Sequence, residues 1–433
     1  MKPSITKKMS LDSILRKTFS ALYHRDYRNF WMGQVISTIG SMIQVTALSW
    51  YVYQISDSPF LLGLMGVFEF GPVLLLTLFS GVLIERFPKK KILLITQIVF
   101  MLQSLTLAVL VWQGVTNYWV FAMLALVAGI TMSVEQPTRQ SYFVELVGKN
   151  DLPNAISLNS TTFNLARIVG PLIAAVVMRY LGIAQCFLIN GLSFIPVLYG
   201  IMLISVIGKP RKKDTESRML AEIKEGVLYA VRNEKILPTF LIVFVIGIFA
   251  MNYSVILPVL AKDVLMGNEH VYSTLMSLFG LGSLFGALFM GSIGKDIRSK
   301  HFLVMTALSI GALQMITLVF IESYILMAIF LVVLGFLTLC FLNRANTRIQ
   351  LNITDEYRGR VMSIYVLVVT GSTPLGNAFI GWSMDHIGKP YGFFIGGIVS
   401  FAIVFTLFVI YRKYLKKAQV VPDKKKKYHF FGL

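Results

Sequence analysis

Apolar residues in this chain of 433 residues arrive in blocks of about 20, the length of a membrane-spanning helix. Such a helix crosses the roughly 30 Å hydrocarbon core of a bilayer. Only 14% of the residues are charged, against about 25% in a soluble globular domain. Strands of a β-barrel would be about 10 residues long and would alternate in polarity, and these blocks do not. The sequence therefore predicts an all-α membrane protein.

The predicted spans number twelve and are joined mostly by short connections. Their approximate bounds are 28–55, 60–84, 92–112, 118–140, 157–180, 184–207, 237–260, 271–293, 302–321, 324–345, 361–384 and 391–411. Some spans exceed about 20 residues, which a tilted helix accommodates. The first block is too long for the apolar core of a signal peptide, so we expect it to stay as a helix.

The longest polar stretch lies between the sixth and seventh spans and divides the chain. It separates an N-terminal half, 28–207, from a C-terminal half, 237–411, and the polar segments 1–27 and 412–433 flank these halves. Within the linker, 208–236, apolar residues recur at helical spacing among charged ones. That pattern predicts an amphipathic helix lying on the inner membrane face.

Corresponding spans of the two halves end in similar sequences. Span 2 runs into a basic connection at 81–91, and span 8 runs into another at 291–300. Span 4 closes with the segment 138–140 (TRQ), and span 10 closes with 347–350 (TRIQ). Because both matches fall at equivalent places, we predict two pseudo-symmetric six-helix halves, an arrangement found in many membrane transport folds.

Basic residues are distributed unevenly about the predicted membrane. The formal net charge is +19, from 40 Lys and Arg against 21 Asp and Glu. If both termini are cytoplasmic, the outer connections hold only Arg179, Lys262 and Lys389. Arg167 lies within a span, and the other basic residues then face the cytoplasm. The positive-inside rule predicts that orientation. The excess charge then reflects topology and contact with anionic lipid, and we expect no nucleic acid partner.

Several segments resemble a known family. The connection 85–90 (ERFPKK) between spans 2 and 3 resembles the signature loop of the major facilitator superfamily, with Glu85 where Asp is usual and Pro88 where Gly is usual. The segments 28–34 (RNFWMGQ) and 358–363 (RGRVMS) are similar to the drug:proton antiporter branch, which includes macrolide efflux proteins and enterobactin exporters. The resemblance implies the twelve-helix fold of that superfamily, built from two six-helix halves.

The same resemblance implies a function. We expect a proton-coupled secondary exporter of small hydrophobic or amphipathic molecules that works by alternating access. The expected partners are a small-molecule substrate, protons and the lipid bilayer, and the expected form is a monomer in a bacterial inner membrane. A dedicated exporter of an endogenous metabolite such as a siderophore stays open as an alternative, as do nutrient uptake and a non-transporting membrane scaffold. One fold hosts many cargoes, so the substrate does not follow.

Ionisable residues inside a bilayer are costly, and each is a functional candidate by default. Glu69 lies within span 2, between Phe68 and Phe70. A carboxylate there could take up and release a proton during a transport cycle, so we predict that Glu69 couples transport to protons. A structural hydrogen bond within the N-terminal half is the competing interpretation.

Arg167 lies near the middle of span 5 and cannot readily lose its proton. It therefore needs an anionic partner, which could be Glu69 or an anionic substrate. A fixed internal ion pair, serving structure alone, is the competing interpretation. Polar residues of the spans that could face a cavity and bind substrate beside Arg167 include Gln44, Asn164 and Asn377.

A second group of residues is predicted to control conformational switching. In the family, the loop that holds Glu85, Arg86 and Lys90 braces the two halves in one state. Glu135 and Arg139 are four residues apart on one helical face near the cytoplasmic end of span 4, which predicts a gate-side or structural pair.

A Gly-Pro pair follows Arg167 in span 5. Gly170 and Pro171 resemble the antiporter motif, which lets spans pack closely between the halves, and we count them among the switch residues. A purely structural kink is the alternative.

The chain has no phosphate-binding Walker loop, and no catalytic triad stands in a water-facing segment. Its five histidines are scattered singly, without the spacing of metal ligands. The two cysteines fall inside apolar spans. We therefore predict that the protein is not an enzyme and has no cofactor and no metal site.

Overall fold

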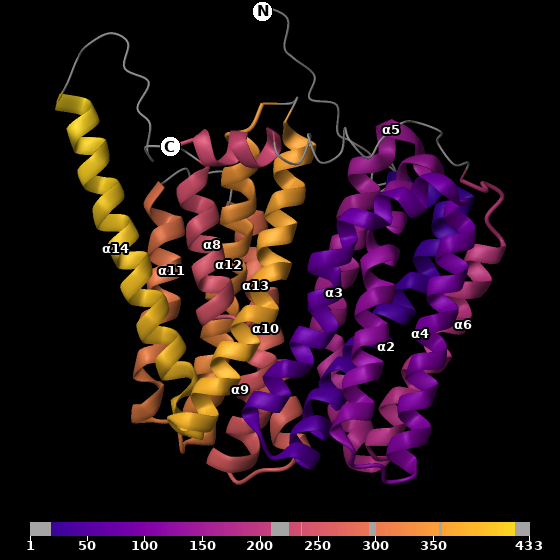
Figure 1. The fold of residues 1–433 in the computed structure, drawn as a ribbon, viewed down its shortest axis with the longest axis horizontal. Helices are drawn as coiled ribbons and strands as arrows, with labels where there is room; N and C mark the ends of the chain where they lie inside the picture. The colour runs from indigo at the N-terminus through magenta and orange to yellow at the C-terminus, as the bar shows by residue number, and fades with distance from the viewer. Residues whose placement is uncertain (1–18, 209–224, 235, 294–299, 355–356, 421–433) are drawn as a thin grey trace, which may run out of the picture.

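A computed structural model describes residues 19–208, 225–234, 236–293, 300–354 and 357–420. Every regular element in these ranges is helical (Figure 1). Eleven helical stretches are long and apolar enough to cross a membrane. One of them, with 63 residues, is long enough for two crossings, so the described residues make twelve crossings, and the predicted fold class is confirmed.

The N-terminal half contains six crossings in five long helices. They are α2 (Arg25–Ser56), α3 (Pro59–Arg86), α4 (Lys89–Trp112), α5 (Tyr118–Tyr180) and α6 (Ile183–Met202), preceded by the short η1 (Ser20–Tyr23). At 63 residues, α5 would be about 95 Å long if straight, roughly three times the hydrocarbon core. Gly148, with φ 73°, breaks it into two crossings outside that core.

The C-terminal half also makes six crossings. Its elements are α8 (Leu237–Phe249), α9 (Tyr253–Val259), the π-helical turn η2 (Leu260–Val264), α10 (Glu269–Ile293), α11 (Lys300–Met315), η3 (Ile316–Val319), α12 (Tyr324–Leu351), α13 (Arg358–His386), η4 (Lys389–Tyr391) and α14 (Gly392–Val420). The last helix continues past 411, into the segment predicted to be a polar tail.

Span 7 differs from the continuous helix predicted over 237–260. It consists of α8, α9 and η2, with a break between Phe249 and Tyr253. Backbone groups freed by a break inside a membrane must find partners. The Gln314 side chain of α11 donates a hydrogen bond to the Ala250 carbonyl at 2.9 Å, and Asn252 Nδ2 donates to the Ile248 carbonyl at 2.6 Å. Side chains thus stabilise the interruption.

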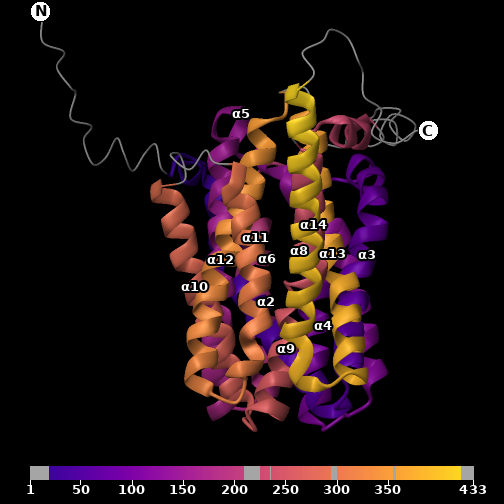
Figure 2. The same cartoon turned by 90° about the vertical axis from the view of Figure 1, so that its left-hand side faces the viewer.

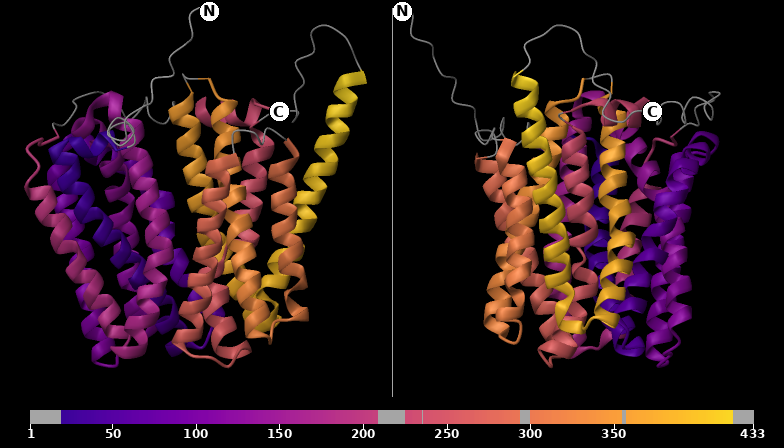
Figure 3. Two further views of the ribbon diagram at one scale, coloured as in Figure 1. Left: turned by 180° about the vertical axis from the view of Figure 1, so that it is seen from behind. Right: turned by 60° about the vertical axis from the view of Figure 1, so that its left-hand side comes forward.

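The two halves stand side by side with their helices nearly parallel to one axis (Figures 1 and 2). They come together at the end where α2 passes into α3 and spread toward the end where α2 begins (Figures 1 and 3). We call the first end the far end. We call the second the basic end, because Arg86, Lys89 and Lys90, where α3 passes into α4, lie there.

Close helix contacts join the halves along α3 with α13 and along α5 with α10. A Cβ added at Gly63 of α3 would collide with the backbone oxygen of Asn377 on α13. A Cβ at Gly280 of α10 would lie 3.1 Å from the Cα of Ile168 on α5. Small residues therefore let the backbones of the two halves approach closely, as they do in many membrane helix pairs.

Most of the linker predicted to hold an amphipathic helix, 209–224, lies outside the described residues. Residues 225–232 are helical. Glu225 forms a 2.9 Å ion pair with Arg360 of α13, and the ring of Tyr229 stacks on that of Tyr357 with centroids 4.4 Å apart. This part of the linker thus attaches to the C-terminal half at the basic end.

Candidate functional site

A cavity of about 530 Å³ lies between the two halves. Its walls come from α2 to α6 on one side, and from α8, α9, α10, α12 and α13 on the other. Small-molecule sites typically enclose about 300–1,000 Å³ and are concave with a few placed polar groups. The cavity is therefore the candidate substrate site.

The N-terminal half supplies every charged residue that lines the cavity within the described chain. These residues are Glu69, Glu135, Arg139 and Arg167. It also supplies the side-chain amides of the wall, namely Gln34, Gln44, Gln97, Gln103, Gln136 and Asn190. This wall of the cavity is strongly polar.

Gln44 lies at the centre of a hydrogen-bond network in this polar wall. Its Nε2 donates to Gln103 Oε1 at 3.2 Å. Its Oε1 accepts from Ser104 Oγ at 2.6 Å and from Asn190 Nδ2 at 2.9 Å. The structure thus places Gln44 in the cavity wall, as the sequence predicted, with its orientation fixed by α4 and α6.

Glu135 and Arg139 form the ion pair that their spacing predicts. Arg139 Nε lies 3.0 Å from Glu135 Oε1, and both residues are about 95% buried. Arg139 also donates to Asn159 Oδ1 at 3.2 Å and lies over the Phe163 ring. Each charge therefore has its partner within the protein, which is what makes a buried pair tolerable.

Glu69 and Arg167 both line the cavity, and they do not pair with each other. Neither makes a hydrogen bond or an ion pair with any residue in the described part of the chain. The Arg167 side chain is exposed toward the cavity. Of the two partners that the sequence left open for Arg167, the structure thus rules out Glu69 in this state.

The C-terminal half lines the cavity with apolar and hydroxyl side chains. Several hydroxyls donate to carbonyls of their own helix, among them Thr338 to Leu334 at 2.7 Å and Ser372 to Val369 at 2.9 Å. The Tyr253 hydroxyl is 3.0 Å from Thr338 Oγ1. Because these hydroxyls already form hydrogen bonds within the protein, this wall offers mainly apolar surface to a ligand.

The break in span 7 borders the cavity and differs from the continuous helix that hydropathy predicted. Met251 in the break and Tyr253 and Ser254 just after it line the wall. The available signal was Asn252, a polar residue followed six positions later by Pro258 in an otherwise apolar run. Interrupted membrane helices often border transport sites, because their freed backbone needs a polar surface.

Two predicted substrate-binding residues lie elsewhere, and for them the prediction needs correction. Asn377 is buried beside Gly63 and Gly66 of α3, at the contact between the halves, and does not line the cavity. Asn164 is exposed and is also absent from the cavity wall. Hydropathy locates a residue within a span, but the rotation of the helix decides which side it faces.

The predicted switch loop packs within the N-terminal half. Lys90 Nζ donates to the carbonyls of Met202 and Ile204 at 3.0 and 2.7 Å, at the end of α6. Arg86 is exposed and has no partner among the described residues. Glu85 lies in α3, and its side chain is outside the described part of the structure. The switching role of this loop stays a prediction.

Gly170 packs against α2 of its own half. A Cβ there would collide with Met42. Pro171 follows within α5. The glycine that faces the other half at this contact is Gly280, opposite Ile168. The Gly-Pro pair therefore acts on the α2–α5 contact, next to the interface between the halves.

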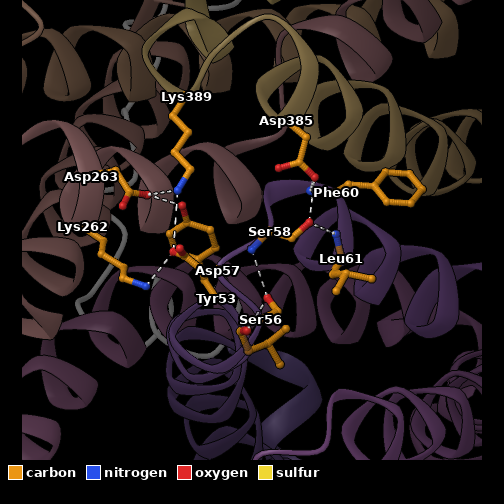
Figure 4. Close-up of polar contacts among 11 residues, drawn as sticks. Tyr53, Ser56, Asp57, Ser58, Phe60, Leu61, Lys262, Asp263, Asp385 and Lys389 are labelled. Carbon is orange, nitrogen blue, oxygen red and sulfur yellow. Dashed lines mark hydrogen bonds and ion pairs between the residues drawn. The ribbon is translucent and has the colours of Figure 1, made fainter.

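Charged side chains join the two halves at the far end (Figure 4). Asp57, which follows α2, forms ion pairs with Lys262 at 2.9 Å and Lys389 at 3.6 Å. Lys389 also pairs with Asp263 at 3.3 Å, and the Tyr53 hydroxyl donates to Asp263. We call Tyr53, Asp57, Lys262, Asp263 and Lys389 the far-end cluster. It links residues more than 200 positions apart in the chain.

A second contact lies beside the far-end cluster. The Ser58 hydroxyl donates to Asp385 Oδ2 at 2.7 Å, and the Phe60 backbone N–H donates to the same oxygen at 3.1 Å (Figure 4). The Lys262 ammonium holds the pKa of Asp57 below its ordinary value. Asp57 is therefore ionised at neutral pH, where its ion pairs join the two halves.

Comparison with known proteins identifies the family. The profile of the transmembrane secretion effectors matches residues 16–430. The chain belongs to this family. It is 25% identical to the staphyloferrin A transporter of Staphylococcus aureus, over 89% of this chain and 96% of that protein. It is 22% identical to macrolide efflux protein A of Streptococcus pyogenes, over 87% and 94% of the two chains.

Solved structures agree on the fold. The structure superposes on the nucleoside transporter NupG with a TM-score of 0.69, at 12% identity, over 90% of this chain and 98% of that one. The family is one of transmembrane secretion effectors, and the two relatives are named a transporter and an efflux protein, which are not enzymes. The predicted resemblance to the major facilitator superfamily is thus confirmed.

Proposed function

We propose that the protein is a proton-coupled exporter of small hydrophobic or amphipathic molecules that works by alternating access. The observation that carries the proposal is the cavity between the halves, which holds an unpaired carboxylate at Glu69. Membership in an efflux and secretion family supports the outward direction. A non-transporting scaffold would have no use for a cavity of this size, so the cavity argues against that alternative.

The orientation follows from the positive-inside rule. The basic end faces the cytoplasm, both termini lie there, and the membrane is the bacterial inner membrane. The far-end cluster then closes the outer side of the cavity, and the halves spread toward the cytoplasm (Figure 1). Cargo enters from the cytoplasm in this state, and the protein works as a monomer in the bilayer.

Glu69 couples the cycle to protons by being neutral in one state and ionised in another. Protonation shifts the equilibrium between the states only to the extent that the two states bind the proton with different affinity. The switch residues Glu85, Arg86 and Lys90, with Gly170 and Pro171, act on this equilibrium and do not touch cargo. Gln44 and Arg167 belong to the cargo-binding wall.

The test is ethidium efflux from cells that express the chain, measured with and without an uncoupler. We expect uncoupler-sensitive efflux that is lost in Glu69→Gln. Glu269→Gln is the matched control, because Glu269 begins α10 away from the cavity, and it should behave as the wild type. Full uncoupler-sensitive efflux by Glu69→Gln would remove the assigned role of Glu69.

A second candidate is a dedicated exporter of an endogenous metabolite such as a siderophore. It is favoured by the unpaired cation Arg167 and by similarity to a protein named staphyloferrin A transporter. Under this proposal, ethidium efflux is absent although the protein reaches the membrane. The growth medium of a deletion strain then lacks one small molecule that the parent strain secretes.

A further inference from the structure

Arg167 differs from the other basic residues placed near the site. Arg139 is paired with Glu135, and Lys262 and Lys389 of the far end are paired with Asp57. Arg167 has no such partner among the described residues, although it lies near the middle of a membrane span. An unpaired cation in that position is costly, and residues that carry such a cost usually mark a substrate or ion pathway.

The guanidinium is presented to the cavity. Arg167 is exposed on the cavity side of α5, and the cavity is the empty space next to it. No carboxylate of the polar wall pairs with it in this structure, because Glu135 is bound to Arg139 and Glu69 makes no ion pair with Arg167. The cavity is therefore where an anionic partner for Arg167 can bind.

The wall of the C-terminal half would contact a different part of a molecule bound in the cavity. Met276, Phe279, Leu339 and Leu342 lie on it, and no charged residue of the C-terminal half lines the cavity within the described chain. A ligand that spans the cavity thus meets a cation on one side and apolar surface on the other. Burial of apolar area contributes about 25 cal/mol per Å², so the second contact adds affinity without demanding a fixed geometry.

We propose that the cargo is an amphipathic anion whose carboxylate pairs with Arg167 and whose apolar part lies against the wall of the C-terminal half. The inference rests on the proposed function, because it takes the cavity as the cargo site. A carboxylate suits this position, since the planar guanidinium forms two parallel hydrogen bonds with it. Lys offers a point charge without that fork.

The test is equilibrium binding to the purified full-length protein, followed by the fluorescence of two probes that differ in one charge. Dansyl-phenylalanine carries a carboxylate, and its methyl ester is neutral with nearly the same shape. The variants are Arg167→Gln, which removes the charge, and Arg167→Lys, which keeps it. Arg179→Gln is the matched control, because Arg179 lies on the same helix outside the cavity and contacts Tyr180.

The wild type should bind the acid more tightly than the ester. A charge-assisted hydrogen bond is worth about 1.5–3 kcal/mol, so Arg167→Gln should weaken binding of the acid about 10- to 100-fold. Binding of the ester should stay unchanged, which also shows that the variant is folded. The affinity of Arg167→Lys for the acid should lie between the affinities of the wild type and of Arg167→Gln. Arg179→Gln should bind both probes as tightly as the wild type does.

Two results would overturn the inference. One is a wild type that shows no preference for the acid, including one that binds neither probe. The other is an Arg167→Gln variant whose affinity for the acid is unchanged or falls equally for both probes. Binding needs no proton gradient, so a failure of proton coupling, read from the efflux of dansyl-phenylalanine with and without an uncoupler, leaves this result untouched and can be told apart from it.

Discussion

The two halves share one fold and divide the charge between them unequally. In the cavity the N-terminal half supplies all four charged residues of the described wall, and the C-terminal half supplies none. At the far end the balance reverses, since Lys262, Asp263, Asp385 and Lys389 come from the C-terminal half and only Asp57 from the other. The two halves therefore share a pseudo-symmetric backbone but differ in where their charged side chains lie.

The halves also differ in how their helices cross the bilayer. The N-terminal helices run unbroken past the cavity, and the long α5 is interrupted only at Gly148, outside the core. In the C-terminal half, span 7 is broken beside the cavity and is held by Gln314. One half therefore lines the cavity with charged groups, and the other lines it with apolar surface and an interrupted helix.

The largest expected effect comes from the ion pair of the N-terminal wall. Glu135→Ala leaves the Arg139 charge buried without a partner, and such a loss costs about 3–5 kcal/mol. Ser372→Ala, on the opposite wall, removes a hydroxyl that bonds only its own helix and should cost about 1 kcal/mol or less. The midpoint of thermal unfolding in detergent should therefore fall much more for Glu135→Ala.

Replacing both partners sharpens that prediction. Glu135→Leu combined with Arg139→Met removes the pair without leaving a buried charge, so stability should recover most of the loss. Equal destabilisation by the single, the double and the Ser372→Ala variants would show that the two walls do not differ in this way.

The next largest loss of stability is expected at the break in span 7. Gln314→Met keeps the volume of the side chain but leaves the Ala250 carbonyl without its donor, at a cost of about 1–3 kcal/mol. Gln350→Met is the control, because that exposed residue bonds only Asn346 on its own helix. Thermal unfolding should separate the two variants, and equal midpoints would mean that the break does not depend on Gln314.

Weakening the far-end cluster should change the balance of states more than the stability. Exposed ion pairs contribute about 0–1 kcal/mol each, so Lys262→Gln should raise the population of the state open at the far end about two- to fivefold. Asp57→Asn should act alike, since Asn tolerates the left-handed backbone at that position, where φ is 50°.

The measurement is the distance between spin labels at Gln113 and Met266, which lie in far-end connections of the two halves. Cys186 and Cys340 are buried, so they compete little for the label. Arg179→Gln, outside the far-end cluster, should leave the distance distribution as it is in the wild type. A shift in that control equal to the shift in Lys262→Gln would refute the assignment.

The smallest expected effect concerns pH. The pKa of Asp57 is lowered by Lys262 from an ordinary value of about 3.9. A carboxylate with a lowered pKa keeps its pairing above that value and loses it only as the pH falls further. In a Glu69→Gln background, which removes the proposed coupling group, the distance distribution should therefore stay the same between about pH 7.5 and 5.5, and a change there would show that a group other than Asp57 controls the far end.

Features that depend on residues close together in the chain could be predicted from the sequence alone. The twelve crossings and the division into halves follow from blocks of apolar residues, and the Glu135–Arg139 pair follows from helical spacing. Glu69 and Arg167 stood out as charges within spans, because the energetic cost of a charge in a bilayer does not depend on the tertiary fold.

Packing between helices decided the rest. The rotation of each helix about its own axis places Gln44 in the cavity wall and buries Asn377 between the halves. Contacts between distant segments decided that Arg167 has no partner among the residues that the structure describes and that Asp57 pairs with Lys262. Hydropathy and spacing are local properties of a chain. The rotation of each helix and its partners are set by the packing of all twelve crossings, so only the tertiary structure could reveal them.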